Sequence, residues 1–191
     1  MKTPLRYQIT EFDCASASLT NCISYLFDRE EIPAELIKII NAYTLDCYDK
    51  FGNLGNKGTS REVVEYLSKW IVQYGENNNF NIRCKYVEKE NVSLDLIKEW
   101  IKNKGCVNVR TYCDGVEHYV TITNIKNKFV YIFDPYYIPE KNFNNNTEVF
   151  FEHNPFKYNR KVSLERFTSL SPLDFSLGPI EKRECVLVSR T

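Results

Sequence analysis

The sequence has no excess of charge of either sign. Its 191 residues include 25 lysines and arginines and 25 aspartates and glutamates, which gives a formal net charge of zero. Proteins that bind nucleic acid present a field of basic side chains, so this balance predicts no nucleic-acid partner. The sequence also lacks an apolar run long enough to span a membrane or to form the core of a secretion signal. We therefore expect no membrane span and a cytoplasmic location.

Histidines and closely spaced cysteines are also scarce. With two histidines and no CxxC pair, the sequence argues against a zinc site, and we expect neither a metal nor an organic cofactor. The seven cysteines are an odd number and are scattered along the chain, which argues against the disulfide framework of a small secreted protein. The remaining composition is that of an ordinary globular protein, in a length that suits one domain.

The order of the expected elements predicts an α+β fold. Apolar residues recur with helical spacing mainly in the first half of the chain, and stretches typical of strands follow in the second half. Helices first and mostly antiparallel strands later favour α+β over a doubly wound parallel sheet. We expect one domain over 1–191, with a core of about 1–137 and an extension, 138–191, that ends in a strand. The expected helices are 15–27, 33–43, 59–74 and 94–101, the expected strands are 82–87, 106–112, 118–125, 129–137 and 184–190, and a loop is expected at 142–147.

The stretch QITEFDC, from Gln8 to Cys14, ends where the first expected helix begins. The first turn of a helix has unpaired N–H groups and the positive end of the helix dipole, which lower the pKa of a thiol placed there. Cys14 is therefore a candidate nucleophile, although the negative charge of Asp13 works against its thiolate. The alternative is a buried helix cysteine, because free cysteine is among the most buried residue types.

A nucleophilic cysteine needs a base, and the sequence offers two histidines. His153 follows an asparagine-rich stretch and is expected in a loop. His118 begins an expected strand and alternates with Val120 and Ile122, so it shares their inward face. The alternative for His118 is a histidine that only packs at the edge of a strand.

A hairpin between the two strands that flank Lys126 would bring an acid to His118. If the hairpin is centred on Lys126, His118 faces Asp134, and directly opposed residues have Cβ atoms about 4.5–5.5 Å apart. A two-residue turn at Lys126 and Asn127 would put Asp134 on the opposite face, so the contact requires an odd-length loop or a bulge. A carboxylate that holds an imidazole is the orienting acid of a catalytic triad. The alternative is an Asp-Pro turn that only ends the strand.

Gln8 is a candidate for the fourth role in such a site. Acyl transfer passes through a tetrahedral oxyanion, which needs hydrogen-bond donors fixed in advance. The side-chain N–H of Gln8 and the backbone N–H of Cys14 would supply two of them. By itself Gln8 indicates little, since glutamines are mostly solvated surface residues.

These residues together resemble one family. Q-x5-C with aspartate directly before the cysteine, a helix rich in small residues, then H-Y-V and, sixteen residues after the histidine, F-D-P resembles the bacterial papain-like peptidases that process bacteriocin leaders. Those peptidases trim double-glycine leader peptides, usually as the amino-terminal domain of an export transporter. The resemblance implies a papain-like fold in which a helical half faces a sheet half across the active-site cleft. It also implies Cys14 as nucleophile, His118 as base, Asp134 as orienting acid and Gln8 as oxyanion donor.

We therefore predict a stand-alone papain-like cysteine hydrolase, a peptidase that forms an acyl-enzyme with a peptide or other acyl substrate. Two alternatives stay open. An amine that resolves the acyl-enzyme in place of water would make the protein an acyltransferase. The fold could also serve as a binding module that does not use its triad. The sequence does not predict the oligomeric state.

Overall fold

A computed structural model describes residues 1–143 and 146–191 of the chain, and Asn144 and Asn145, in the expected loop 142–147, lie outside the described residues. Helices pack against a seven-stranded sheet in which every described pairing is antiparallel, which confirms the α+β prediction. The α-helices are α1 (Cys14–Leu26), α2 (Ala34–Tyr43), α3 (Arg61–Asn78), α4 (Leu94–Lys102) and α5 (Leu164–Thr168). The strands are β1 (Ile82–Glu88), β2 (Cys106–Cys113), β3 (Val116–Lys126), β4 (Phe129–Phe133), β5 (Val149–Asn154), β6 (Tyr158–Ser163) and β7 (Glu184–Arg190).

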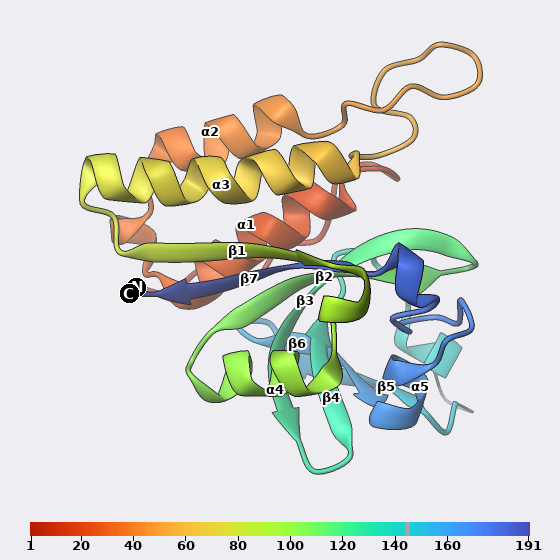
Figure 1. Cartoon of the computed structure of the whole chain (residues 1–191). Coiled ribbons are helices and arrows are strands. Elements are labelled where there is room, and N and C mark those ends of the chain that lie inside the picture. The colour runs from red at the N-terminus through yellow and green to blue at the C-terminus, as the bar shows by residue number, and fades with distance from the viewer. Residues whose placement is uncertain (144–145) are drawn as a thin grey trace.

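The last strand of the chain lies inside the sheet. The strand order is β1-β7-β2-β3-β4-β6-β5, so β7 pairs with β1 on one side and with β2 on the other (Figure 1). The predicted strand 184–190 is confirmed, whereas β5, β6 and α5 were not predicted and β4 is shorter than 129–137. The segment that follows residue 137 therefore supplies three strands of the same sheet.

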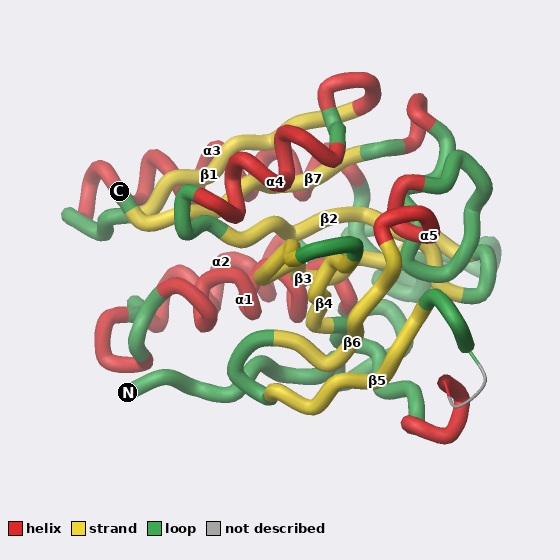
Figure 2. The backbone as a smooth tube through the Cα atoms, turned by 90° about the horizontal axis from the view of Figure 1, so that it is seen from below, coloured by secondary structure: helices red, strands yellow, loops and turns green. Residues whose placement is uncertain are grey.

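Apolar clusters cover both faces of the sheet. The helices α1, α2 and α3 pack on one face, and α4 and α5 lie against the other (Figures 1 and 2). The small residues at the start of α1, Ala15 to Ser18, are buried, and small side chains let a helix approach a strand closely. Two hydrogen bonds fix that approach: the Ser18 hydroxyl donates to the Tyr119 carbonyl at 2.8 Å, and the Thr121 hydroxyl donates to the Ser18 carbonyl at 2.9 Å. The beginning of α1 is thereby held beside β3.

The hairpin of β3 and β4 differs from the predicted one. Lys126 pairs with Phe129, so the turn has two residues, and Asn127 adopts a left-handed conformation with φ 56°. A two-residue turn alone would put Asp134 on the wrong face, but a bulge between Ile122 and Asn124 changes the register by one residue.

As a result Ile122 pairs with Ile132 and Thr121 with Phe133, so the predicted register, with His118 directly opposite Asp134, is wrong. The bulge still returns Asp134 to the face of His118, because the register differs from the predicted one by an even number of residues.

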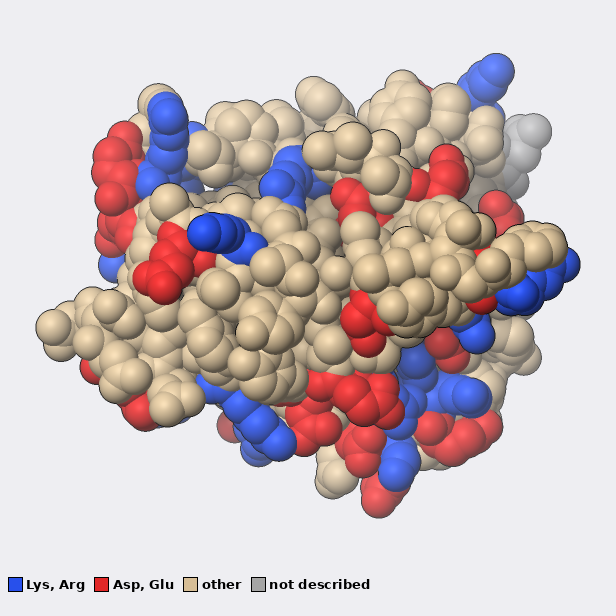
Figure 3. All heavy atoms as spheres, turned by 90° about the horizontal axis from the view of Figure 1, so that it is seen from above, with Lys and Arg blue, Asp and Glu red and all other residues tan. Residues whose placement is uncertain are grey.

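The surface carries charges of both signs. Seen from above, over α2 and α3, lysines and arginines are interspersed with aspartates and glutamates (Figure 3). Among the described residues, no helix combines the length and the apolar character needed to cross a bilayer.

The central position of β7 predicts a large effect of truncating its buried side chains. Leu187 is 0% exposed, so we expect Leu187→Ala to lower the free energy of unfolding by about 2–5 kcal/mol through lost burial and a residual cavity. The matched control is Leu170→Ala, because Leu170 is 61% exposed and its truncation should cost less than about 0.5 kcal/mol. Urea denaturation of the three proteins measures both values, and equal midpoints would contradict the central position of β7.

Candidate active site

Cys14 is the first residue of α1, and its side chain is half-buried. The preceding Asp13 turns its carboxylate away from the helix and accepts hydrogen bonds from the N–H groups of Ile9, at 3.1 Å, and Thr10, at 2.7 Å. Burial acts to raise the pKa of Asp13, but these hydrogen bonds and one from the Thr10 hydroxyl outweigh it and lower the pKa. The carboxylate of Asp13 thus bonds to the turn before the helix. The N–H groups of the first helical turn therefore have no side-chain cap.

His118 lies on β3 and is buried. Its ring Nε2 is 2.7 Å from Asp134 Oδ1, and the ring lies close to Cys14, with which it lines the same pocket. Burial by itself lowers the pKa of His118, but the hydrogen bond and charge of Asp134, followed by those of Cys14, outweigh it and raise the pKa to about 10. The imidazole is therefore protonated at neutral pH, with a sulfur on one side and a carboxylate on the other.

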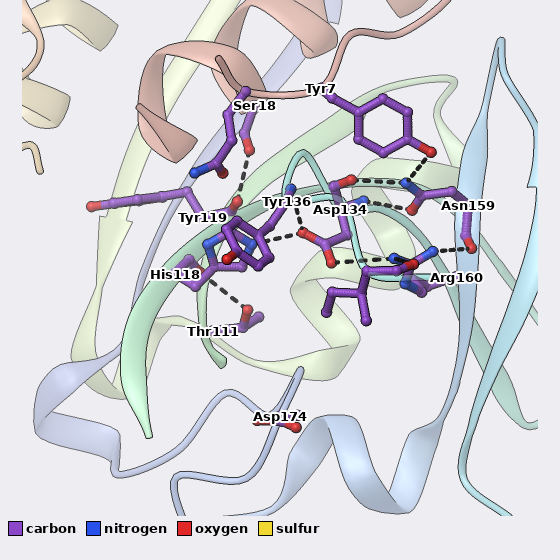
Figure 4. A network of polar contacts seen from close by, with 12 residues as sticks. Tyr7, Ser18, Thr111, His118, Tyr119, Asp134, Tyr136, Asn159, Arg160 and Asp174 are labelled. Carbon is purple, nitrogen blue, oxygen red and sulfur yellow. Dashed lines mark hydrogen bonds and ion pairs between the residues drawn. The ribbon is translucent and has the colours of Figure 1, made fainter. Parts of the chain in front are cut away.

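Asp134 makes both of the contacts that the sequence suggested for it. Its Oδ1 accepts the hydrogen bond from His118 and a second one, at 2.9 Å, from the backbone N–H of Tyr136, which is the turn expected of an Asp-Pro sequence. The side chain of Asn159 holds the backbone of Asp134 at both polar groups: it accepts from the N–H at 2.8 Å and donates to the carbonyl at 2.8 Å (Figure 4).

Two residues of β6 near this acid were missed in the sequence. Asn159 and the fully buried Arg160 are neighbours in the chain, and Arg160 Nη2 is 3.8 Å from Asp134 Oδ2. The segment KYNRKVS has no regular alternation of apolar residues, so neither the strand nor its buried polar pair could be found by periodicity.

Gln8 lies beside the segment that follows Asp134. Its backbone N–H donates to the Pro135 carbonyl at 2.9 Å, and its side-chain Nε2 donates to the Thr10 carbonyl at 2.7 Å. The side-chain oxygen of Gln8 is buried and has no hydrogen-bond partner among the described residues. The structure thus brings Cys14, His118 and Asp134 together, and it holds Gln8 beside the segment after Asp134 with its amide turned toward Thr10.

A pocket of about 520 Å³ opens over Cys14 and His118. Its walls come from the start of α1, the loop before α3, the turn between β2 and β3, and the segment after β4. This volume lies within the range of pockets that bind small molecules. The lining residues are Glu11, Phe12, Cys14, Asn56, Lys57, Gly58, Cys113, Asp114, Val116, Glu117, His118 and Tyr136.

The other cysteines differ from Cys14 in their surroundings. All seven are free thiols. Cys113 also lines the pocket, but burial and the charges of Asp134, Asp174 and Asp114 raise its pKa to about 12. Burial likewise raises the pKa of Cys47, Cys84, Cys106 and Cys185, which keeps these thiols in their unreactive form.

His153 was expected in a loop, but it lies on β5, where its ring is exposed and stacks on Phe151. It is not among the residues that line the pocket. Within the described part of the chain, no group of three or more histidine, cysteine, aspartate or glutamate side chains is arranged to hold a metal ion.

The sequence matches no protein-family model and no curated protein. Among solved structures, it is similar to a Bacillus anthracis protein provisionally assigned as a C39-like peptidase, with a TM-score of 0.55 and 14% identity over 98% of this chain and 95% of that one. At this identity the likeness shows the fold alone, and it confirms the papain-like α+β fold expected from the sequence.

Two further structures are similar at lower TM-scores. The peptidase domain of Streptococcus ComA, a bifunctional ABC transporter of a quorum-sensing pathway, has a TM-score of 0.49 and 13% identity over 98% of each chain. A double-glycine-motif protease from an AMS/PCAT transporter, in complex with its leader peptide, has a TM-score of 0.45 and 15% identity over 98% of this chain and 91% of that one.

The bond between His118 and Asp134 predicts how the ring titrates. We expect the His118 ring signals in an NMR titration to change near pH 10 in the native protein, since its pKa is raised to about 10. In Asp134→Asn the charge of the acid is lost, and the midpoint should fall by about 1–3 units. A His153→Gln variant assigns the signals, and an unchanged midpoint in Asp134→Asn would contradict the role of the carboxylate.

The same shift fixes the sign of the effect on stability. The folded-state pKa of His118 lies above the ordinary value of 6.5, so the protonated ring contributes its full stabilisation below about pH 6.5. That contribution decreases as the pH rises and is lost as the pH passes about 10. The difference in unfolding free energy between the native protein and Asp134→Asn should shrink over the same range.

Proposed function

We propose that this protein is a cysteine hydrolase that cleaves peptide bonds through an acyl-enzyme on Cys14. The observation that carries the proposal is the 2.7 Å contact of His118 with Asp134, next to Cys14, in one open pocket that both His118 and Cys14 line. A nucleophile, a base and a group that orients the base are the three parts that covalent acyl transfer needs.

The charges at the site favour a thiolate before substrate binds. The raised pKa of His118 means that the ring holds a proton at neutral pH, and an imidazolium beside a thiol at a helix amino terminus stabilises the thiolate. In the proposed mechanism Cys14 Sγ attacks a carbonyl carbon as the thiolate while His118 holds the proton.

The remaining steps use the same groups. Attack on a peptide carbonyl forms a C–S bond and a tetrahedral oxyanion, and His118 then gives its proton to the leaving amine as the C–N bond breaks. Water, deprotonated by His118, attacks the thioester and releases the carboxylic acid and the thiolate. Asp134 keeps the ring oriented in both halves of the cycle.

The oxyanion needs two donors in this proposal. The backbone N–H of Cys14 is one of the free groups of the first helical turn. The second would be a side-chain N–H of Gln8, whose amide donates to Thr10 in this structure; because Gln8 is not among the residues that line the pocket, the amide would have to turn toward Cys14 to take this role. The position of Gln8 beside Pro135, close to the acid, supports this role.

The pocket supports a peptide as substrate. It is open to the surface and combines apolar side chains, Phe12 and Val116, with polar ones, which suits a chain of mixed side chains better than a uniformly apolar ligand. The family that the sequence motifs resemble also acts on peptides.

The first test compares thiol reactivity at two pH values. We expect iodoacetamide to label Cys14 rapidly at pH 6, because its thiolate is paired with His118, and this labelling should fall about tenfold or more in His118→Ala. The matched control is His153→Ala, which should label like the native protein. Peptide mapping by mass spectrometry identifies the labelled cysteine, and labelling that begins only near the ordinary thiol pKa of about 8.5 would contradict the proposal.

Turnover separates hydrolysis from the two alternatives. Incubation with a mixed peptide library should give new termini that depend on Cys14, with a loss on the order of 10³-fold or more in Cys14→Ser at unchanged stability. Added amines that are captured as amide products, with little free acid, would indicate an acyltransferase. Rapid labelling without any product from either assay would indicate a binding module.

Gln8 gives a separate prediction, because an oxyanion donor acts only on the transition state. Gln8→Ala should lower kcat about 10²–10³-fold and leave the iodoacetamide labelling of Cys14 unchanged, since labelling forms no oxyanion. Gln8→Glu, which has the same shape but presents oxygen atoms, should be at least as slow. A normal kcat in Gln8→Ala would remove Gln8 from the proposed mechanism.

A further inference from the structure

The second carboxylate oxygen of Asp134 has no hydrogen bond. Oδ1 accepts from His118 and from the backbone of Tyr136, whereas Oδ2 is buried and has no hydrogen-bond partner among the described residues. The cationic group that faces Oδ2 is the guanidinium of Arg160, with Nη2 at 3.8 Å (Figure 4). Because a buried carboxylate is costly without a nearby positive charge, the position of Arg160 bears on the charge of Asp134.

Arg160 is held in place by groups other than Asp134. Its Nη1 donates to the carbonyl of Asn159 at 2.9 Å, and its Nη2 donates to the carbonyl of Ile138 at 3.2 Å. The guanidinium also lies over the rings of Phe143 and Phe151, at 4.6 Å and 5.4 Å from their centres. The side chain is 0% exposed, so its charge is fixed in position whatever the state of the acid.

In the proposed mechanism four groups alternate in charge across the site: the Cys14 thiolate, the His118 imidazolium, the Asp134 carboxylate and the Arg160 guanidinium. In the proposed cycle His118 gives its proton away and becomes neutral. At that moment Asp134 would be a buried anion with no cation beside it, except for Arg160. A carboxylate without such a cation would take up a proton or rotate, and either change would leave His118 without its acceptor.

We propose that Arg160 is a positioning residue of the site, which acts through Asp134 by keeping that carboxylate charged and turned toward His118. The inference rests on the proposed function, since it assigns a second support to the acid of the same site. The other titratable groups that face Arg160 or Asp134 are Cys113 on β2 and Tyr7 and Tyr137 on the flanking segments, and none of them carries a positive charge.

The test uses neutral and charged replacements of Arg160 and reads the labelling of Cys14 by iodoacetamide. We expect Arg160→Met and Arg160→Gln to lower the rate at pH 6 about tenfold, the effect of a change of one pKa unit, and to leave the rate at pH 9 within about threefold. Arg160→Lys retains the charge and should keep most of the rate at pH 6. The matched control is Lys161→Met, because Lys161 is the adjacent charged residue of β6 and pairs with Glu152 instead.

A double variant shows whether Arg160 acts through the acid. In an Asp134→Asn background, Arg160→Met should change the rate at pH 6 less than about twofold, since the group that it supports is already neutral. An equal loss in both backgrounds would overturn the proposal, and so would an Arg160→Met or Arg160→Gln protein that labels at the native rate at pH 6. A loss in Arg160→Lys as large as in Arg160→Gln would also overturn it.

Folding supplies the remaining outcomes. If neither neutral single variant folds, the double variant Arg160→Met with Asp134→Asn decides, because it removes both buried charges and leaves neither unpaired. A folded double variant supports the pairing, and an unfolded one shows that Arg160 is needed for the fold independently of Asp134, which overturns the proposal. The labelling measures thiolate formation without a substrate, so the two proposals can fail separately. If the native protein labels rapidly but cleaves no peptide, the proposed function is wrong, and the labelling of the Arg160 variants still decides the role of Arg160.

Discussion

The carboxylate of Asp134 is out of contact with water, and a buried charge is stable only when other groups pair with it. Its partners come from three places: His118 on β3, the backbone of Tyr136 in the turn after β4, and Arg160 on β6, whose neighbour Asn159 holds the backbone of Asp134. The carboxylate therefore requires β3, β4 and β6 to be assembled before its charge is compensated. The same requirement fixes His118, because the ring and the acid share one short hydrogen bond.

The position of the sulfur depends on a second constraint, the close packing of α1 on β3. Small side chains at the start of α1 let the helix approach the strand, and the hydrogen bonds between Ser18 and β3 set the separation. Cys14 is the first residue of that helix, so the packing of the helix on the strand also determines the distance from sulfur to imidazole. The helical half and the sheet half of the fold thus meet at the site, and neither half contains it alone.

The carboxy-terminal third of the chain contributes from behind the site. The residues that line the pocket all precede residue 137, whereas Asn159 and Arg160 contact the acid from the side away from the pocket. The last strand, β7, fills the middle of the sheet and joins β1 to β2. The segments after residue 137, which were predicted from the sequence as an extension of the core, are therefore part of the structure that buries Asp134 and faces its carboxylate with Arg160.

Much of this protein could be read from local sequence patterns. Helical periodicity and strand-forming runs predicted α1 and β7 almost to the residue, and residue types in a fixed order predicted that Cys14, His118 and Asp134 would come together. These signals are local or depend only on residue type, so they can be recognised without knowing which distant residues each segment contacts.

The sequence by itself determined the α+β class and the identity of the three side chains that meet. Only the tertiary structure decided the register of the hairpin. Nothing in the sequence marks the bulge between Ile122 and Asn124, yet this bulge determines on which face of the sheet Asp134 lies. The same holds for Asn159 and Arg160, whose polar strand shows no periodicity and whose burial follows from packing against distant segments. A pattern within one segment reports which residues share a face, and the partner that covers this face is chosen by the whole chain.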